Sequence, residues 1–278
     1  MTANRRISNL AVAFNGGEAS VVALRGAIAV ARDFGAHLTG ILAHGASSTS
    51  RNIPKWMSVD LQQSILSTLE IRAEEIRSKF HAIADALMPA DKLHWLEIGG
   101  DPDTTISDYS QMYDLTILGE YESLVSADEL ELHPNKVVSS SGRPVLMVPK
   151  RNNGVQTGGT IVIAWDGNRA VTGAVANAMP LLVGAGRVVV LTVENGRTGT
   201  PLPGIDVKVM LERHGIEADW VRQAPKQDAL ANDVKTFCQH NHADLLVMGA
   251  SSKSRISGHA AGNSINTYLR DSEIPIFI

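Results

Sequence analysis

The second half of this chain repeats the pattern of the first. When residue 14 is laid over residue 165, Val12–Gly16 (VAFNG) falls on Ile163–Gly167 (IAWDG). Further along, Asp114–Gly119 (DLTILG) matches Asp244–Gly249 (DLLVMG). Similarity at so long a period indicates a fold built from two copies of one unit.

The two copies differ in length between matching strands. Each closes on a proline and an apolar run, PVLM at 144–147 and PIFI at 275–278. The first copy holds roughly twenty additional residues between its second and fourth strands, and we place them at 47–58 and in a longer following helix. A polar, glycine-rich stretch, Lys150–Gly159, separates the copies. The sequence therefore predicts domains over 1–150 and 151–278, a comfortable size for two units.

Each half reads as five strands alternating with four helices. In the first half we expect strands near 9–14, 38–43, 93–97, 114–118 and 144–148, and helices near 18–34, 57–88, 103–112 and 126–140. In the second half we expect strands near 160–165, 187–193, 217–222, 244–248 and 274–278, and helices near 168–184, 204–214, 227–241 and 262–270. The strand runs are continuously apolar, as in parallel strands covered on both faces. The pattern predicts an α/β protein with two tandem doubly wound, parallel five-stranded sheets, whose ligands lie at the carboxyl ends of the strands.

Composition narrows the function classes. The net charge is −4 and no basic stripe is present, which argues against a nucleic-acid partner. No apolar run approaches the roughly 18 residues of a membrane span, and the run after Arg5 and Arg6 is too short for a signal peptide. The one cysteine, Cys238, lies on the apolar side of an expected helix, so we interpret it as a core residue. A chain with one cysteine suits a reducing compartment, and we expect a cytoplasmic protein.

The most specific motif follows the fourth strand of the second half, within residues 244–266. That strand runs into Gly249, a serine-rich loop follows, and Gly262 opens an apparent helix. A strand, a glycine loop and a helix N-terminus together make an anion site, because free N–H groups and the helix dipole face the bound charge. The segment resembles the ATP loop of the universal stress protein family: Gly-x-x-Gly, nine residues, then Gly-Ser/Thr. Both outer glycines and the spacer are present, whereas the second glycine is replaced by Ser252 and the hydroxyl residue by Asn263.

The resemblance covers nearly the whole chain. It implies a Rossmann-like fold of the adenine nucleotide alpha hydrolase type, with the two halves related by a pseudo-two-fold axis. It also implies a stress-response regulatory protein that binds ATP or another adenine nucleotide, with Mg²⁺ accompanying it and at most slow hydrolysis. The ligand would then bias conformation or partner choice. The implied nucleotide-binding residues are Asp166, Val193, Gly249, Ser251, Ser252, Gly262, Asn263 and Ser264.

Several of these residues have a second interpretation from their type and position. Asp166 is expected at the adenine or ribose end of the ligand, and a strand-end aspartate can equally cap the next helix. Gly249 and Gly262 would allow positive φ and close approach to phosphate, or form an ordinary turn. Asn263 and Ser264 could donate to phosphate or act as a plain N-cap. If position 252 needs positive φ, a serine there costs about 1 kcal/mol or more.

The first half carries no such loop. Asn15 stands where the second half has Asp166, and the segment after Gly119 has no second glycine. The acids in Glu120–Glu131 would repel a triphosphate, so we interpret this half as a degenerate, structural copy.

Two other function classes stay open at this point. One is a member that binds no nucleotide and acts through protein–protein contacts or a different small ligand. The other is an adenine-nucleotide-dependent enzyme of the same superfold. No nucleophile–base–acid set, HExxH or CxxC motif is present, so an enzyme is not expected.

An assembly is also expected from the closing strands. Val145–Val148 and Ile276–Ile278 would leave apolar edges if they were unpaired. In single-domain members of the family such strands pair across a two-fold axis, so we expect the two halves to pair within one chain. A homodimer of the whole chain would then be optional, and the protein partner is open.

Overall fold

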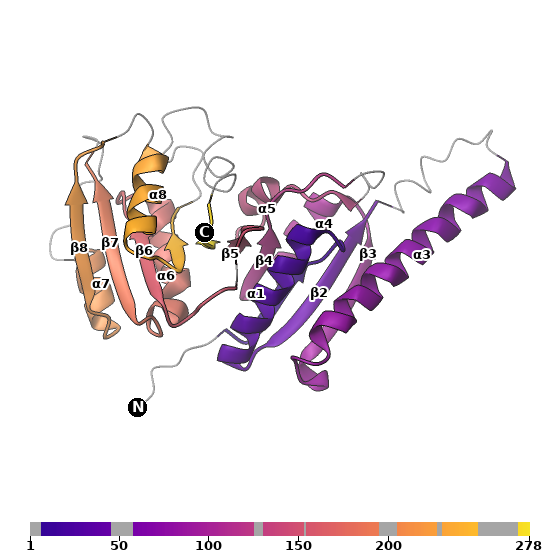
Figure 1. Ribbon diagram of the computed structural model, residues 1–278, viewed down its shortest axis with the longest axis horizontal. Coiled ribbons are helices and arrows are strands. Elements are labelled where there is room, and N and C mark those ends of the chain that lie inside the picture. The colour runs from indigo at the N-terminus through magenta and orange to yellow at the C-terminus, as the bar shows by residue number, and fades with distance from the viewer. Residues whose placement is uncertain are drawn as a thin grey trace. The chain divides into compact units, whose positions relative to one another are not determined.

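The computed structural model describes residues 7–45, 58–124, 130–152, 154–194, 205–226, 230–249 and 272–278. The chain divides into two compact units, Ser8–Arg143 and Pro144–Ile278, the second of which also includes Ile7 (Figure 1). The sequence repeat ends the first copy at residue 150. The last strand of that copy is therefore counted with the second unit when contacts rather than repeats define the division.

The first unit is a parallel sheet covered by helices. Its strands lie in the order β3-β2-β1-β4, and β1 pairs in parallel with both β2 and β4. Its elements are β1 (Asn9–Ala13), α1 (Glu18–Phe34), β2 (His37–His44), α3 (Val59–Ala84), the 3-10 turn η1 (Ala90–Lys92), β3 (Leu93–Gly99), α4 (Pro102–Ser110), β4 (Leu115–Gly119) and α5 (Pro134–Ser140).

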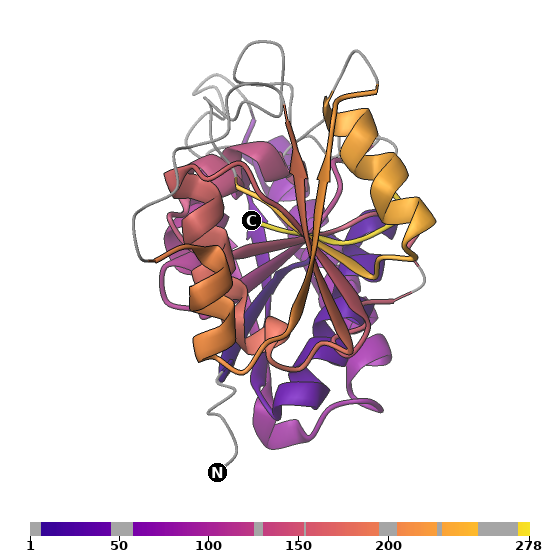
Figure 2. The same ribbon diagram turned by 90° about the vertical axis from the view of Figure 1, so that its left-hand side faces the viewer.

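The second unit repeats this arrangement and adds two strands, β10 and β5. Its order is β5-β10-β9-β6-β7-β8, parallel throughout except for β5, which pairs antiparallel with β10. Figure 2 shows α8 on one face of this sheet and α6 and α7 on the other. Its elements are β5 (Val145–Val148), β6 (Thr160–Ala164), α6 (Arg169–Leu182), β7 (Arg187–Val193), α7 (Val207–Arg213), β8 (Ala218–Gln223), α8 (Leu230–His240), β9 (Leu245–Val247) and β10 (Ile276–Phe277).

The central strands form the core because they are apolar along their whole length. Leu10–Val12 in β1 and Ile161–Ile163 in β6 are fully buried. Near the end of β1, Phe14 packs edge-on against Phe80 of α3, with ring centroids 5.6 Å apart. Phe80 also lies within 2.4–2.9 Å of where a Cβ on Gly40 would be, so β2 needs a glycine there to admit the ring.

The fold class expected from the sequence is confirmed, and so is the longer helix of the first half, whereas all but the last residue of the expected insertion at 47–58 lies outside the described residues. α3 has 26 residues and its counterpart α7 has 7. The helix expected over 126–140 is wrong in its start, because α5 begins at Pro134 and Leu132 and His133 are not helical. Proline is favoured at the first position of a helix. The residues before Pro134 make contacts with the first-half site that are described below. The expected helix at 262–270 lies outside the described residues.

Candidate functional site

Three of the predicted site residues lie at the ends of adjacent strands in the second unit. β9, β6 and β7 are adjacent parallel strands. Gly249 follows β9, Asp166 follows β6, and Val193 is the last residue of β7. All three therefore lie at carboxyl ends, where ligands of doubly wound sheets bind. The other five predicted residues, Ser251, Ser252, Gly262, Asn263 and Ser264, lie outside the part of the chain that the structure describes.

Asp166 holds the residue that caps α6 and is not itself the cap. Its Oδ1 accepts the backbone N–H of Asn168 at 3.0 Å, and its Oδ2 accepts the Asn168 side-chain amide at 2.6 Å. Asn168 in turn accepts the N–H of Val171 at 2.9 Å. The interpretation of Asp166 as the N-cap is therefore wrong by two residues. The half-buried carboxylate fixes the turn between β6 and α6.

Gly249 is explained by packing against α6. A Cβ at this position would lie 2.5 Å from the Val171 nitrogen and 2.8 Å from the Ala170 carbonyl carbon, and backbone atoms cannot move aside. Gly249 is not among the positive-φ glycines of the described chain, so the positive φ expected there is wrong. A Cβ on Gly119, its counterpart, would likewise lie 2.5 Å from the Ala19 carbonyl oxygen of α1. The glycine thus lets the first turn of the helix lie directly on the end of the strand.

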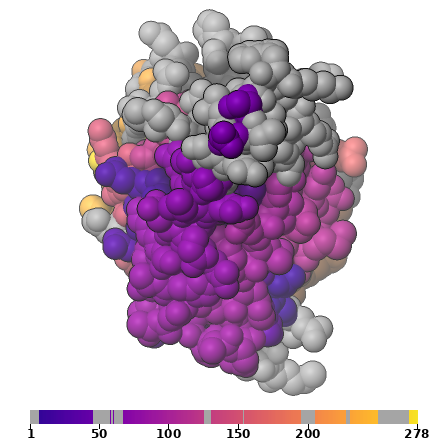
Figure 3. Space-filling model, turned by 90° about the vertical axis from the view of Figure 1, so that its right-hand side faces the viewer, coloured from indigo at the N-terminus to yellow at the C-terminus, as the bar shows by residue number. Residues whose placement is uncertain are grey.

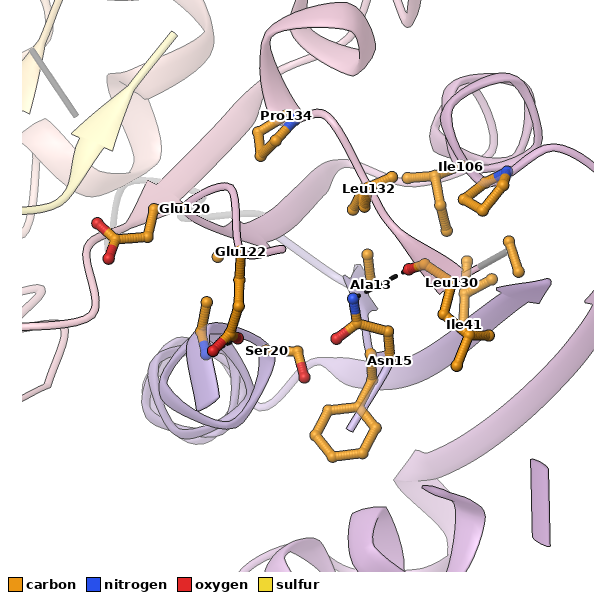
Figure 4. Close-up of a pocket in the computed structure, with 15 residues that line it drawn as sticks. Ala13, Asn15, Ser20, Ile41, Ile106, Glu120, Glu122, Leu130, Leu132 and Pro134 are labelled. Atoms are coloured by element: carbon orange, nitrogen blue, oxygen red, sulfur yellow. Dashed lines mark hydrogen bonds between the residues drawn. The ribbon is translucent and has the colours of Figure 1, made fainter. Parts of the chain in front are cut away.

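The first half keeps the same turn with different side chains. The Asn15 Oδ1 accepts the N–H of Gly17 at 3.1 Å, which repeats the contact of Asp166 with Asn168. The residue between them is a positive-φ glycine in both halves, Gly16 at 81° and Gly167 at 73°. The Asn15 amide also donates to the Leu130 carbonyl at 3.1 Å (Figure 4).

The site in the first half is almost filled by the protein itself. We use the term strap for the described parts of the segment between β4 and α5, Glu120–Leu124 and Leu130–His133. Leu130 and Leu132 of the strap, with Pro134, line the pocket at the ends of β1, β2 and β4 (Figure 4). The remaining cavity is about 30 Å³, enough for no more than a few water molecules. Ligand pockets run from roughly 300 to 1,000 Å³, so a nucleotide does not fit this cavity.

A carboxylate of the strap reaches the start of α1. The Glu122 Oε2 accepts the N–H of Ala19 at 2.9 Å. Glu131 holds the strap together by accepting from the Tyr121 hydroxyl, the Ser123 hydroxyl and the Leu124 N–H at 2.9–3.1 Å. The hydrogen bonds from Ser123, Leu124 and Tyr121 lower the pKa of the Glu131 carboxyl, and Ser123 contributes most. Glu122 and Glu131, which we interpret from the sequence as repelling a triphosphate, therefore stabilise the fold through hydrogen bonds.

The far end of the strap is tied to α4. The buried carboxylate of Asp103 accepts the His133 N–H at 2.6 Å, the His133 ring Nδ1 at 3.0 Å and the Lys136 ammonium at 2.8 Å. The hydrogen bond to Asp103 raises the pKa of the Lys136 ammonium. The His133 ring stacks on Tyr121 with centroids 5.1 Å apart. Three donors to one carboxylate fix the position at which α5 begins.

Sequence reasoning missed Glu122, Leu130 and Trp165. Trp165 is the counterpart of Phe14, which lines the pocket of the first half, and the alignment of the two copies could have pointed to it. Glu122 and Leu130 have no counterpart in the repeat. One signal for Glu122 was present in the sequence. Position 17 is a glycine, so α1 has no capping side chain of its own, whereas α6 has Asn168 at the matching position.

Other candidates for chemistry are absent from the described residues. No group of three or more His, Cys, Asp or Glu side chains in the described ranges could hold a metal ion. Cys238 is buried in α8, as expected, and burial raises the pKa of its thiol to about 12. None of the helices described is long and apolar enough to cross a membrane.

Comparison with known proteins places the fold. A universal stress protein from Archaeoglobus fulgidus DSM 4304 matches with a TM-score of 0.68 at 15% identity, over 99% of this chain and 97% of its own. A functionally unknown protein from Pseudomonas aeruginosa PAO1 matches with a TM-score of 0.55 at 16% identity, over 98% and 92% of the two chains. A candidate universal stress protein from Pseudomonas aeruginosa UCBPP-PA14 matches with a TM-score of 0.53 at 16% identity, over 98% and 93%. No protein-family model matches the sequence, and no curated protein matches it. The chain therefore has the fold of the universal stress proteins.

Proposed function

We propose that the protein is a universal stress protein with a regulatory role, and that it binds one adenine nucleotide, ATP foremost, in its second half. The observation that carries this proposal is the arrangement at the strand ends of the second half, where Asp166, Val193 and Gly249 lie at the carboxyl ends of adjacent parallel strands. The cavity at the strand ends of the first half is only about 30 Å³, and for this reason we expect one nucleotide per chain.

The chemistry of this edge suits a nucleotide. Asp166 is half-buried and already oriented by Asn168, so its carboxylate is placed for ribose or adenine donors at little further cost in side-chain entropy. Trp165 precedes it and is half-buried, which offers an aromatic surface next to the site. The serine-rich loop after Gly249 would receive the phosphates, with Mg²⁺ as their counter-ion. Binding would bias conformation or the choice of a protein partner, with at most slow hydrolysis.

Calorimetric titration of the purified protein with ATP in the presence of Mg²⁺ tests the proposal. We expect one site per chain, and a loss of affinity of about tenfold or more in Asp166→Asn, because the amide keeps the turn but loses the charge-assisted hydrogen bonds. Asn15→Ala, at the matching position of the first half, is the control and should bind as the wild type does. Two equal sites per chain, or wild-type affinity in Asp166→Asn, would contradict the proposal.

The altered loop favours a second candidate, a different small ligand in the same place. Ser252 and Asn263 replace a glycine and a hydroxyl residue of the ATP loop. The double substitution Ser252→Gly with Asn263→Ser separates the two candidates in the same titration. If the wild type binds ATP, the variant should bind it more tightly by a modest factor. ATP binding that arises only in the variant would favour the second candidate, and an affinity equal in both would show that neither residue faces the phosphates.

A further inference from the structure

The two copies of the fold cap their first helix in different ways. In the second half, the N-cap of α6 is Asn168, whose side chain accepts the Val171 N–H at 2.9 Å. In the first half, the N-cap of α1 is Gly17, which has no side chain to do this. The backbone is otherwise the same, with φ and ψ of −69° and 165° at Gly17 and −82° and 167° at Asn168. An asparagine is therefore compatible with the backbone at position 17, so its absence has another cause.

The carboxylate of Glu122 occupies the place that a side chain at position 17 would take. A Cβ on Gly17 would lie 2.6 Å from the Glu122 Oε2 and 3.1 Å from the Leu124 Cδ2, so a side chain there would push the carboxylate away from α1. The same oxygen accepts the Ala19 N–H at 2.9 Å, in the first turn of α1. A negative charge at this point is favoured by the helix dipole and by the unsatisfied N–H groups of the first turn. Glycine and glutamate, 105 positions apart in the chain, are thus complementary in shape and charge.

The rest of the strap occupies the remaining space of the site. Leu130 and Leu132 line the pocket beside the end of β1 and leave about 30 Å³ of it open, and the Asn15 amide donates to the Leu130 carbonyl at 3.1 Å. Figure 4 shows Glu122 on one side of Asn15 and Leu130 on the other. The Glu122 carboxylate thus lies at the N-terminus of α1, where a bound anion would lie. The apolar side chains of Leu130 and Leu132 lie where the uncharged part of a ligand would lie.

We propose that the strap is a built-in occupant of the first-half site, in which Glu122 substitutes for the anionic group of a ligand. The first half then holds its strand ends in an occupied arrangement without a nucleotide, and it is closed to one. This inference concerns the first half alone and does not depend on what the second half binds.

Replacement of the carboxylate by a small free carboxylate tests the proposal. Glu122→Ala should lower the thermal midpoint of the full chain by about 2–4 °C, the size of a lost helix cap. Added sodium acetate should restore most of that shift, because acetate can enter the vacated place at the Ala19 N–H. Sodium chloride at equal ionic strength should not. Glu75→Ala, which removes an exposed glutamate from α3, is the matched control and should show neither effect.

A second variant supplies the cap from within the chain. In the Glu122→Ala background, Gly17→Asn should raise the midpoint again and remove the response to acetate, because the asparagine can accept the Ser20 N–H as Asn168 accepts that of Val171. Glu122→Gln, which keeps an acceptor oxygen and the shape, should have an intermediate midpoint and little response to acetate.

Two results would overturn the proposal. One is a Glu122→Ala midpoint equal to that of the wild type. The other is an acetate effect of the same size in the wild type, Glu75→Ala and Glu122→Ala, which would be a general salt effect. None of these measurements uses a nucleotide, so failure of the nucleotide proposal for the second half would leave the result for the strap unchanged.

Discussion

At the scale of single residues, the glycines at the ends of β4 and β9 serve the packing of helix on strand. A Cβ on Gly119 or on Gly249 would lie within 3 Å of the first turn of a helix, and the two nearest atoms in each case are backbone atoms. A glycine in a phosphate-loop motif can therefore be required before any ligand is considered. The motif alone does not separate these two causes.

Replacing Gly249 with alanine should destabilise the protein by about 1–3 kcal/mol, the usual cost of forcing an extra methyl group into a packed site. Gly173→Ala is the control. That glycine lies inside α6 with nothing within 4 Å of the added Cβ, so the change should stabilise by up to about 1 kcal/mol through helix propensity. Urea unfolding at pH 7 measures both. A Gly249→Ala midpoint at or above that of the wild type would show that α6 can move away from the strand end.

At the scale of elements, each helix near the site begins in a defined way. α4 begins at Asp101, whose side chain accepts the Thr104 N–H at 2.9 Å, and α6 begins at Asn168. α1 begins at a glycine and borrows a carboxylate from the strap. α3, the helix that is longer than its counterpart, spreads over one face of the first unit (Figure 3). The caps of α4 and α6 are adjacent to their helices in the sequence and can be predicted from it. The cap of α1 comes from a distant residue, Glu122, and cannot.

The cap of α4 should make stability depend on pH. The hydrogen bond from the Thr104 N–H is the largest cause that lowers the pKa of Asp101 below its usual value of 3.8. A lowered folded-state pKa means that the stabilisation is present above the unfolded pKa and is lost as the pH falls through the folded one. Asp101→Ala should therefore cost about 1 kcal/mol at pH 7.

Urea midpoints measured from pH 7 downward check this prediction. The difference between Asp101→Ala and the wild type should begin to shrink near pH 4 and continue to shrink below it. Asp108→Ala, which removes an exposed carboxylate from the same helix, is the control for general charge effects. A difference for Asp101→Ala that stays constant over the whole range would mean that the charge of the cap is irrelevant.

At the scale of the whole molecule, the closing strands of the two copies share one sheet. β10 pairs in parallel with β9 and antiparallel with β5, and Ile276 lies opposite Leu246 on one side and Met147 on the other. Ile276 and Phe277 are buried. The pairing of β5 with β10 involves the strands named from the sequence. The pseudo-two-fold relation of the halves and a homodimer of the whole chain stay predictions.

Deletion of Pro275–Ile278 should expose the apolar edges of β5 and β9 and cause association or precipitation, because unpaired edges template strand addition. Ile278→Ser is the control, since it keeps the backbone bonds between residues 145 and 278 and alters one half-buried side chain. Size-exclusion chromatography with light scattering measures the outcome. A truncated chain that stays monomeric and melts at the wild-type temperature would show that β10 contributes little to the fold.

The sequence by itself determined the duplication, the parallel α/β class, the strands and most of the helices. These follow from local period and from short motifs: α1 was expected at 18–34 and is found at Glu18–Phe34. Asp166, Val193 and Gly249 could be placed at one sheet edge because parallel strands share their carboxyl ends. Whether they bind a nucleotide stays a prediction.

Only the tertiary structure decided what fills the first half. The Glu122–Ala19 contact joins residues 103 apart, and the Asn15–Leu130 contact joins residues 115 apart. Such contacts leave no periodic trace in the sequence, because the strap has neither helix nor strand pattern and one member of each pair is a backbone N–H or C=O, a group that carries no sequence signal. The same long-range bonding displaced the start of α5 to Pro134. The sequence shows that the strap is acidic. It does not show which group each carboxylate contacts in the folded protein.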